Sequence, residues 1–527
     1  MQPTELIHSP HLPQQTLKKL SFCESNKPQK LSLWISQLRI TQIMPTAIIL
    51  YRYIPEINQL KCDARTRFTM LELLYPITQD IICSLTKTFL NQPVTLPEEA
   101  KKTALIAQAL QKTLIDGYLL CLRDVISKNH IASKRSAFFN LALHRAITGI
   151  GHLFLRCYQL RIGTPQGLWH QLHRLFVTAD IYNLLHITVE DPTVQHQTTI
   201  EAAYSRVLIL ALSRPNQLGQ KDIQAVSHSA ESWSSHLKYH RVLTDNTTNF
   251  FCVDLESDNA PEKKIAIPIE KKHILELDFT ALLHEIEKRQ HQTGLSTVLR
   301  HHVMNCWSRT PERSQERRNT KDVADMCIGL RDLHQAVSNY DNLDNLIEQS
   351  SHEEKLSDTG INKPFLNHSA SQNTVKTEIQ YHEVSIQNFS SGGYCIVWPS
   401  DVQVKFDSGE IIGIRDNHHT WVCCVIRWIR QCKQGAQLGI QILSDNPQAY
   451  GAAQIYDTGG HADYTRALYL PASDTNDMQA TLITATTPFQ ELQQIKVVEG
   501  KKEQTWLLQQ LLFATRSLQQ FTFKEMD

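Results

Sequence analysis

Two stretches of alternating apolar and polar residues flank a short Gly-rich segment, and this pattern constrains the fold more than any other feature of the chain. Val384 and Ile386 alternate with polar residues before the segment, and residues 394–398 after it are rich in aromatic and β-branched side chains. The segment itself reads Asn388-Phe-Ser-Ser-Gly-Gly. Because glycine tolerates positive φ angles and close backbone approach, we predict a tight turn between two antiparallel strands.

The alternation of apolar and polar residues continues beyond this turn. Gly409 interrupts the alternation, and Gly435 and Gly439 lie near the end of the alternating region. Several short strands separated by turns are typical of a small antiparallel β-barrel. We expect these further strands at residues 402–406, 411–414, 421–429 and 438–442.

Residues 378–446 resemble the PilZ domain, a bacterial receptor module for cyclic di-GMP. The resemblance rests on the Asn-x-Ser-x-x-Gly turn, the Gly409-Glu410 pair before a strand, and the strands Val425-Ile-Arg-Trp and Leu438-Gly-Ile. It implies that Asn388 and Ser390 offer hydrogen bonds to a base or phosphate, while the glycines leave room for the base ring. The ligand-binding residues implied in the turn are Asn388, Ser390, Gly392 and Gly393.

A PilZ ligand site also uses an Arg-x-x-x-Arg segment ahead of the barrel, and two overlapping copies occur here. One runs from Arg309 to Arg313, and the other from Arg313 to Arg317, with Arg318 adjacent. We prefer the second copy because the strand-like residues 323–330 follow it closely. A guanidinium group can donate two parallel hydrogen bonds to a phosphate or to guanine O6 and N7. The resemblance therefore implies that Arg313, Arg317 and Arg318 bind the ligand.

The spacing between the arginines and the turn departs from that of a compact barrel. Arg317 and Asn388 are separated by the 70 residues 318–387. One strand and a turn require far fewer residues. Within this interval, residues 338–376 are rich in Ser, Asn, Asp and Glu, and we predict a disordered insertion between the first two strands. If the arginines belonged to another structural unit, the ligand site would be incomplete.

Each motif also has an ordinary structural interpretation. Asn-Phe-Ser-Ser-Gly-Gly can be a plain hairpin turn, and its position between two strands is what favours a binding site. Arg309, Arg313 and Arg317 recur at helical spacing with Glu312 and Glu316 between them. That pattern is equally typical of a solvent-exposed helix face with ion pairs.

Composition argues against several functional classes. The 527 residues include 53 Lys and Arg and 53 Asp and Glu, so the formal net charge is zero and long-range attraction to nucleic acid is not expected. The chain starts without a signal-like segment, and its most apolar run, residues 207–212, is far shorter than the roughly 20 residues of a membrane span. We therefore predict a cytoplasmic protein without a membrane span. The 12 scattered cysteines and 24 histidines show no complete ligand set, so neither a metal nor a cofactor is expected.

The chain as a whole is predicted to be a multidomain α+β protein, in which an N-terminal α-helical array precedes a small antiparallel β-barrel and a further small β unit. Apolar residues at helical spacing predict amphipathic helices at residues 66–90, 98–121, 134–159, 167–185 and 200–212. The expected divisions are an N-terminal tail (1–45), an α-helical domain (46–235), an α/β connector (236–305), a PilZ-like barrel with its insertion (306–450) and a C-terminal β-containing unit (451–527).

No motif of a familiar catalytic site occurs, so we predict that the protein is not an enzyme. His144, Arg145, His152 and Arg156 on one predicted helix are interpreted as a polar face beside a buried one. The favoured function is a cyclic di-GMP receptor that relays nucleotide occupancy to an unknown protein partner through the helical domain. The alternative is an interaction scaffold whose PilZ-like barrel does not bind nucleotide. The intact turn favours the receptor, and the distant arginines favour the scaffold.

Overall fold

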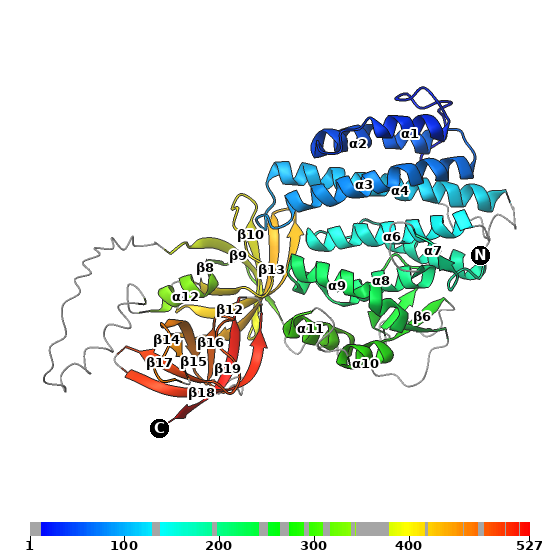
Figure 1. Ribbon diagram of the computed structural model, residues 1–527. Coiled ribbons are helices and arrows are strands. Elements are labelled where there is room, and N and C mark those ends of the chain that lie inside the picture. The colour runs from blue at the N-terminus through cyan, green and yellow to red at the C-terminus, as the bar shows by residue number, and fades with distance from the viewer. Residues whose placement is uncertain are drawn as a thin grey trace, which may run out of the picture. The chain divides into compact units, whose positions relative to one another are not determined.

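The chain forms two compact units, each with its own core (Figure 1). The first comprises residues 1–312 and 403–405, and the second comprises residues 313–402 and 406–527. The structure is a computed structural model. It describes residues 12–128, 137–191, 198–241, 251–263, 273–288, 295–308, 317–338, 343, 379–416, 420–456, 458–472, 479–500, 502–515 and 517–526.

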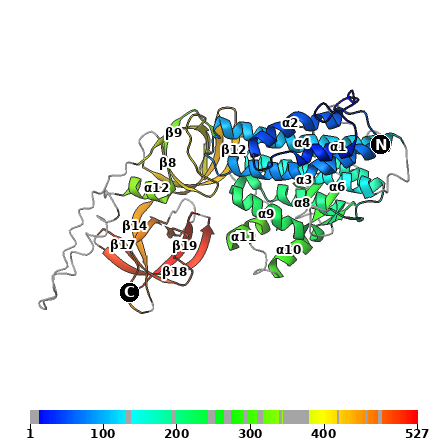
Figure 2. The ribbon, with the colours of Figure 1, turned by 45° about the horizontal axis from the view of Figure 1, so that its top comes forward.

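Layers of α-helices make up most of the first unit (Figures 1 and 2). In succession, α2 packs on α3 and α4, α4 on α6, α6 on α8, and α8 on α9. All five helices predicted between residues 66 and 212 are present. The helices are α1 (Pro28–Ser36), α2 (Ile43–Gln59), α3 (Ala64–Phe89), α4 (Glu98–Ser127), α6 (Ala137–Gln159), α7 (Leu168–Ile181), α8 (Ile200–Leu212) and α9 (Gln220–Trp233).

Local sequence explains where several of these helices begin. The Asp63 side chain accepts hydrogen bonds from the backbone N–H groups of Arg65 and Thr66 and so caps α3. Thr199 caps α8 in the same way through the N–H of Ala202. Two acidic residues, Glu98 and Glu99, occupy the first turn of α4, where the helix dipole favours negative charge. Buried apolar faces then hold the helices together.

The segments at either end of the helical layers differ from the prediction. Residues 1–45 were expected as a tail, yet they include α1, whose Leu31 is fully buried in the core. Beyond the layers, four short strands form an antiparallel sheet in the order β3-β6-β4-β5, followed by two helices. Val253 and Leu277 of this sheet belong to the same core as the helices, so the expected connector packs into the first unit. Its elements are β3 (Lys238–His240), β4 (Phe251–Asp254), β5 (Glu262–Lys263), β6 (Ile274–Asp278), α10 (Thr280–Lys288) and α11 (Thr297–Ser308); a two-stranded ribbon, β1 (Thr188–Val189) and β2 (Thr198–Thr199), precedes α8.

The second unit begins with a closed antiparallel barrel. Its strands follow the order β10-β13-β12-β11-β8-β9, and the pairing of β9 with β10 closes the ring. A short strand, β7 (Arg318–Asn319), also pairs with β9. The barrel strands are β8 (Val323–Ile328), β9 (His382–Ser390), β10 (Gly393–Pro399), β11 (Ile411–Asp416), β12 (Val422–Cys432) and β13 (Gly435–Ser444). The predicted small antiparallel barrel is therefore present.

The strand predicted at residues 402–406 is absent, because this part of the chain forms a loop. Both edges of β10 and both edges of β11 are already occupied by other strands, so the loop has no free edge to join. Its apolar side chains pack against the barrel instead. Phe406 packs on Trp398 with ring centroids 4.9 Å apart, and Trp398 Nε1 donates a 3.0 Å hydrogen bond to the carbonyl of Val402.

The C-terminal β unit is a second closed barrel, with strand order β14-β15-β16-β19-β18-β17. In its core, Trp506 stacks on Phe523 with ring centroids 4.0 Å apart and planes only 5° from parallel. The strands are β14 (Gln448–Gln454), β15 (Thr465–Leu470), β16 (Thr481–Thr484), β17 (Gln494–Glu499), β18 (Lys502–Ala514) and β19 (Gln519–Met526).

A short helix, α12 (Gly329–Val337), contacts both barrels and was not predicted. Leu333 is fully buried in a cluster that includes Val425 of the first barrel and Leu468 of the second. His334 Nε2 donates a 3.0 Å hydrogen bond to the carbonyl of Tyr450 in β14. The apolar spacing within residues 330–337 is helical and could have revealed this element. The predicted insertion at residues 338–376 lies outside the described residues, apart from positions 338 and 343.

Candidate functional site

The turn between β9 and β10 is a two-residue hairpin connection. Ser390 pairs directly with Gly393, which leaves Ser391 and Gly392 as the loop. Asn388 lies two residues before the end of β9 and pairs with a residue of β10. The hairpin therefore brings together all four turn residues that the sequence indicated.

Gly393 is required by the barrel itself. A Cβ atom at this position would lie 2.0 Å from the carbonyl oxygen of Ile440 in β13 and 3.1 Å from the carbonyl carbon. No side chain can occupy that space unless β10 and β13 move apart. Strand packing alone thus explains why residue 393 is glycine, whether or not it also leaves room for a ligand ring.

A β-bulge lies next to the turn. The pairing register of β9 and β10 shifts between Cys395 and Ile396, so that Gln387 is the extra residue on β9. The Gln387 Oε1 atom accepts a 2.6 Å hydrogen bond from Nε2 of Gln437 in β13. Sequence alone did not indicate this amide pair, because a bulge leaves no simple signature in the alternation of residues.

The structure brings the arginine segment to the turn despite the long intervening sequence. In the pairing of β7 with β9, Arg318 lies opposite Phe389 and Asn319 lies opposite Asn388. One guanidinium nitrogen of Arg317, Nη1, donates a 3.3 Å hydrogen bond to Oδ1 of Asn388. The remaining predicted ligand-binding residue, Arg313, lies outside the described residues.

Two exposed basic side chains lie at this end of the barrel. Arg317 and Arg318 are exposed, and neither forms an ion pair with a carboxylate in the described part of the chain. Burial raises the pKa of the nearby Cys395 thiol, and the Arg317 guanidinium acts in the opposite direction. Two exposed guanidinium groups that form no ion pair within the described residues can bind an anionic ligand.

Phe389 adds an apolar surface that sequence reasoning passed over. Its side chain is 37% exposed, although it lies inside the motif between two half-buried polar residues. An exposed aromatic ring beside guanidinium, amide and hydroxyl groups can stack on a planar base. The arrangement is one for recognition, with charge and hydrogen-bond donors around a possible stacking face.

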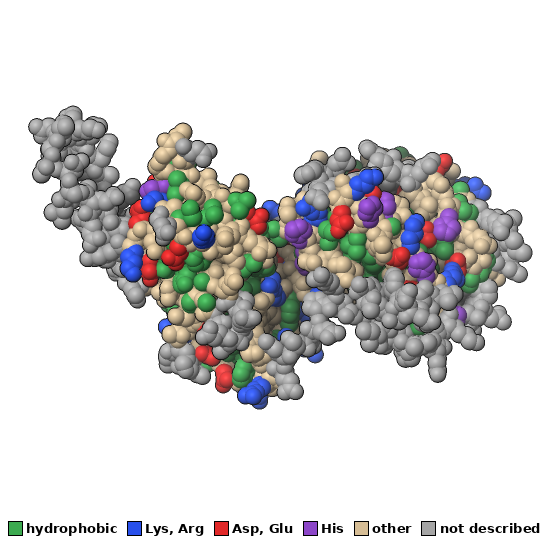
Figure 3. Space-filling view, turned by 90° about the horizontal axis from the view of Figure 1, so that it is seen from below, with side chains coloured by type: hydrophobic (Ala, Val, Ile, Leu, Met, Phe, Trp, Pro, Cys, Tyr) green, Lys and Arg blue, Asp and Glu red, His purple; other side chains and the backbone are tan. Residues whose placement is uncertain are grey.

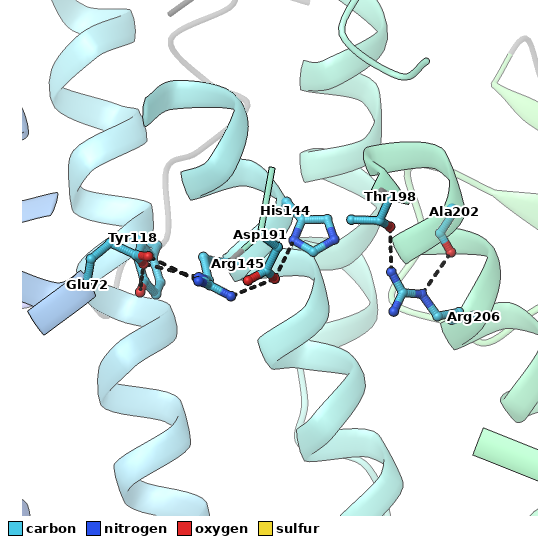
Figure 4. A network of polar contacts seen from close by, with 8 residues as sticks. All are labelled: Glu72, Tyr118, His144, Arg145, Asp191, Thr198, Ala202 and Arg206. Carbon is cyan, nitrogen blue, oxygen red and sulfur yellow. Dashed lines mark hydrogen bonds and ion pairs between the residues drawn. The ribbon is translucent and has the colours of Figure 1, made fainter. Parts of the chain in front are cut away.

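A second group of charged side chains lies inside the helical unit (Figure 4). Arg145 of α6 donates from Nε and Nη2 to the two carboxylate oxygens of Glu72, at 3.1 and 3.0 Å, and from Nη1 to Asp191 at 2.7 Å. Tyr118 donates a 2.6 Å hydrogen bond to Glu72, and the guanidinium lies 3.8 Å from the centre of the Tyr75 ring. Figure 4 shows how Glu72, Tyr118 and Arg145 link α3, α4 and α6. We interpret the network as structural because one buried guanidinium bonds both carboxylates and so links separate elements of the helical unit.

The interpretation of this helix surface as a polar face is wrong. His144, Arg145 and Arg156 are respectively 0%, 2% and 6% exposed. Burial lowers the pKa of His144 well below its usual range, the charge of Arg206 lowers it further, and Asp191, whose carboxylate lies 3.6 Å from Nδ1, opposes both. Helical spacing placed these residues together correctly, but it could not show that neighbouring helices would cover them.

The remaining surveys concern the described residues alone. In that part of the chain, no three or more potential ligands gather in a group suited to a metal ion. None of its helices combines the length and apolarity needed to cross a membrane. On the face shown in Figure 3, the basic and acidic side chains that are described are interspersed.

A closed antiparallel barrel with an Asn-x-Ser-x-x-Gly hairpin, and with an arginine bonded to the Asn, defines the class of protein as one that contains a PilZ domain. Three family models match consecutive parts of the chain. They are the N-terminal domain of the cyclic-di-GMP receptor FimW at residues 29–243, its middle PilZ domain at 250–366 and 361–449, and the FimW C-terminal β-barrel domain at 450–526. The chain therefore belongs to the PilZ domain family, as a long member with an N-terminal helical region.

The cyclic-di-GMP receptor FimW of Pseudomonas aeruginosa is similar to this chain over nearly its whole length. The two are 27% identical over an alignment of 577 residues, which covers 98% of this chain and 94% of the relative. No solved structure matches the chain. The middle-domain match begins at residue 250, although β4, β6 and α10 share their core with the helices of the first unit.

Proposed function

We propose that this protein is a cytoplasmic, non-enzymatic receptor for cyclic di-GMP. The single observation that carries the proposal is the hydrogen bond from Arg317 to Asn388, which joins the two separate motifs in one place. The relative named as a cyclic-di-GMP receptor supports the same ligand. Of the domain divisions expected from the sequence, the α-helical domain, the PilZ-like barrel and the C-terminal β-containing unit remain part of this proposal.

The ligand is held, in this proposal, by two kinds of contact. Arg313 and Arg317 clamp the phosphates or guanine edges, with Arg318 adjacent, because a guanidinium fork matches both groups. Asn388 and Ser390 supply hydrogen bonds from the hairpin, and Gly392 and Gly393 shape the loop beside them. Cyclic di-GMP carries two phosphodiester charges, and the exposed arginines offer the complementary charge.

Occupancy is relayed to a protein partner through the helical unit. In chain order, the arginine segment directly follows α11, the last helix of the first unit. A ligand that contacts this segment in one conformation and not in another shifts the balance between them. The partner binds one of these conformations in preference to the other.

Isothermal titration calorimetry tests the receptor proposal. Cyclic di-GMP should bind with clear preference over GMP and cyclic di-AMP, because two guanines and two phosphates meet the clamp together. Absence of heat at micromolar concentrations of protein and nucleotide would refute it and favour a scaffold with a barrel that does not bind nucleotide.

Two single substitutions test the choice of arginines. Arg317→Ala should weaken binding by about 1.5 to 3 kcal/mol, or roughly 10- to 150-fold in Kd, because it removes charge-assisted hydrogen bonds. Arg309→Ala is the matched control and should change Kd much less. Equal losses from the two substitutions, or no loss from either, would contradict the assignment.

A further inference from the structure

Helix α2 carries an apolar stripe on its outer side. Met44, Ile48 and Tyr51 are 36%, 52% and 51% exposed. They follow one another at four- and three-residue steps, so they lie along one side of the helix. The adjacent face of the helix holds Leu50 and Ile54, which are buried in the core of the unit. Figure 1 shows α1 and α2 at one edge of the helical layers, and the N-terminal segment before α1 reaches α2 through Phe22, whose ring centroid lies 5.0 Å from that of Tyr53.

The spacing of this α2 stripe (Met44, Ile48 and Tyr51) is the spacing used when one helix packs on another. Steps of four and three residues place side chains in the narrow seam of a coiled coil. Pro55 continues the same row one turn later. Leu33 of α1 and Ile40 between the two helices add two more exposed apolar side chains nearby in sequence. Contiguous exposed apolar residues of this kind mark interaction sites more often than scattered single ones do.

Basic residues predominate in the sequence around the stripe, and the one acidic residue of α2, Glu56, accepts two hydrogen bonds from Ser21. Residues 27–52 contain four exposed basic residues and no Asp or Glu, although the whole chain has equal numbers of basic and acidic residues. An occupant of the stripe therefore meets a positive rim and gains from negative charge of its own. The four residues are Lys27, Lys30, Arg39 and Arg52.

These features distinguish between possible occupants. A second copy of the chain, related by a two-fold axis, would bring the same basic residues against one another. Helices that lie in a lipid surface have a broad apolar face, whereas this stripe is a narrow seam flanked by buried and polar positions. A narrow seam with a basic rim fits an amphipathic helix that bears acidic residues.

We propose that the α2 stripe is the docking site for an acidic amphipathic helix of a partner protein. Apolar side chains of that helix pack against Met44, Ile48 and Tyr51, and its Asp and Glu residues face Arg39 and Arg52. Tyr51 is the central anchor, since a half-exposed aromatic side chain can bury a large apolar area at low entropic cost. The inference rests on the proposed relay to a protein partner and adds the surface and the chemistry of that partner.

Photo-crosslinking with the full-length chain in its native host tests the proposal. The photoreactive residue p-benzoylphenylalanine replaces Tyr51 in one variant and Leu105 in the control. Leu105 of α4 serves as the control because it is also an apolar residue on the surface of a helix and is 65% exposed. Mass spectrometry then identifies the crosslinked peptide. We expect crosslinks from position 51 to a helical segment of another protein with an excess of Asp and Glu, and few from position 105.

Charge reversal tests the basic rim in the same assay. Arg39→Glu combined with Arg52→Glu should reduce the crosslink from position 51 by about tenfold or more, because like charges then face each other. Lys433→Glu, at an exposed turn of the second unit, is the matched control and should leave the yield unchanged. Equal yields from both variants would overturn the charge argument.

Other crosslinking outcomes would overturn the proposal directly. These are a crosslink to a second copy, to residues 1–11 of the same chain, to a basic segment or to lipid, and no crosslink above that of position 105. Flotation with vesicles of phosphatidylethanolamine and phosphatidylglycerol provides the lipid measurement. Calorimetry separates this proposal from the receptor, because the double charge-reversal variant should bind cyclic di-GMP as the parent does. A parent that does not bind the nucleotide would refute the receptor, whereas the crosslinks alone decide whether the α2 stripe docks an acidic helix.

Discussion

Replacing Arg145 by Met should lower the stability of the helical unit by about 3 to 5 kcal/mol, the range measured when one partner of a buried ion pair is removed. The structure indicates which carboxylate dominates this loss. The Asp191 side chain is 1% exposed, so it would remain buried without the guanidinium. The Glu72 side chain is 20% exposed and keeps its hydrogen bond from Tyr118, so part of its hydration can return. Met fills similar volume and limits the loss from packing.

Urea unfolding followed by circular dichroism at the helix band measures this effect. Every described helix except α12 belongs to the first unit, so the signal reports mainly on that unit. Arg65→Met is the matched control, because Arg65 is an exposed residue of α3, and it should change stability by less than about 0.5 kcal/mol. The double variant Arg145→Met with Asp191→Leu should be more stable than Arg145→Met alone, since the buried carboxylate that has lost its guanidinium is gone. A loss below about 1 kcal/mol for Arg145→Met, or a double variant that adds the two single losses, would refute the reasoning.

Three further outcomes are expected. Gly393→Ala should destabilise the second unit by more than about 2 kcal/mol in thermal unfolding, because the new Cβ would collide with the Ile440 carbonyl, and wild-type stability would show that the strands separate easily. Burial lowers the pKa of His173 to about 4 in the first unit and that of His334 to about 4 in the second, so each imidazole binds fewer protons in the folded state than in the unfolded state. Each of the two therefore contributes a loss of about 1.4 kcal/mol per pH unit as pH falls from about 6.5 toward 4, and the lowered pKa values of His144 and His152 add to the loss in the first unit. Titrations of stability that stay flat across this window would contradict the assignment. Cyclic di-GMP should slow hydrogen exchange near Arg317 and change it at the boundary of the helical unit, and a change confined to the barrel would refute the relay.

Sequence periodicity predicted the strands and helices well wherever one face of an element is buried. Alternation alone misled at residues 402–406, because the pattern cannot show whether a neighbouring strand has a free edge. It also could not show that residues 236–305 would share a core with the helices, since that depends on contacts distant in sequence. Helix α12 is a different case, because its apolar spacing was visible and was overlooked.

The candidate site shows the same limit. The turn residues are contiguous, so their chemistry could be proposed from the sequence, together with the arginines implied by the family resemblance. The contact between Arg317 and Asn388 depends on how residues 318–387 fold, and no local pattern specifies that. The need for glycine at position 393 likewise depends on the carbonyl of Ile440, which approaches Gly393 because β13 pairs with β10.

The second barrel supports the candidate site from within the same unit. From β7, which borders Asn388, the chain continues through β8 into α12, and α12 is buried against both barrels. Two further contacts join the barrels: the guanidinium of Arg427 lies 4.4 Å from the centre of the Phe513 ring, and the Ser517 hydroxyl donates a 3.2 Å hydrogen bond to the carbonyl of Gly409. A closely packed interface resists small sliding motions, because each displacement opens voids or creates clashes. Strand β7 and the adjacent Arg317 are therefore continuous in sequence with an element that is packed between the two barrels of the second unit.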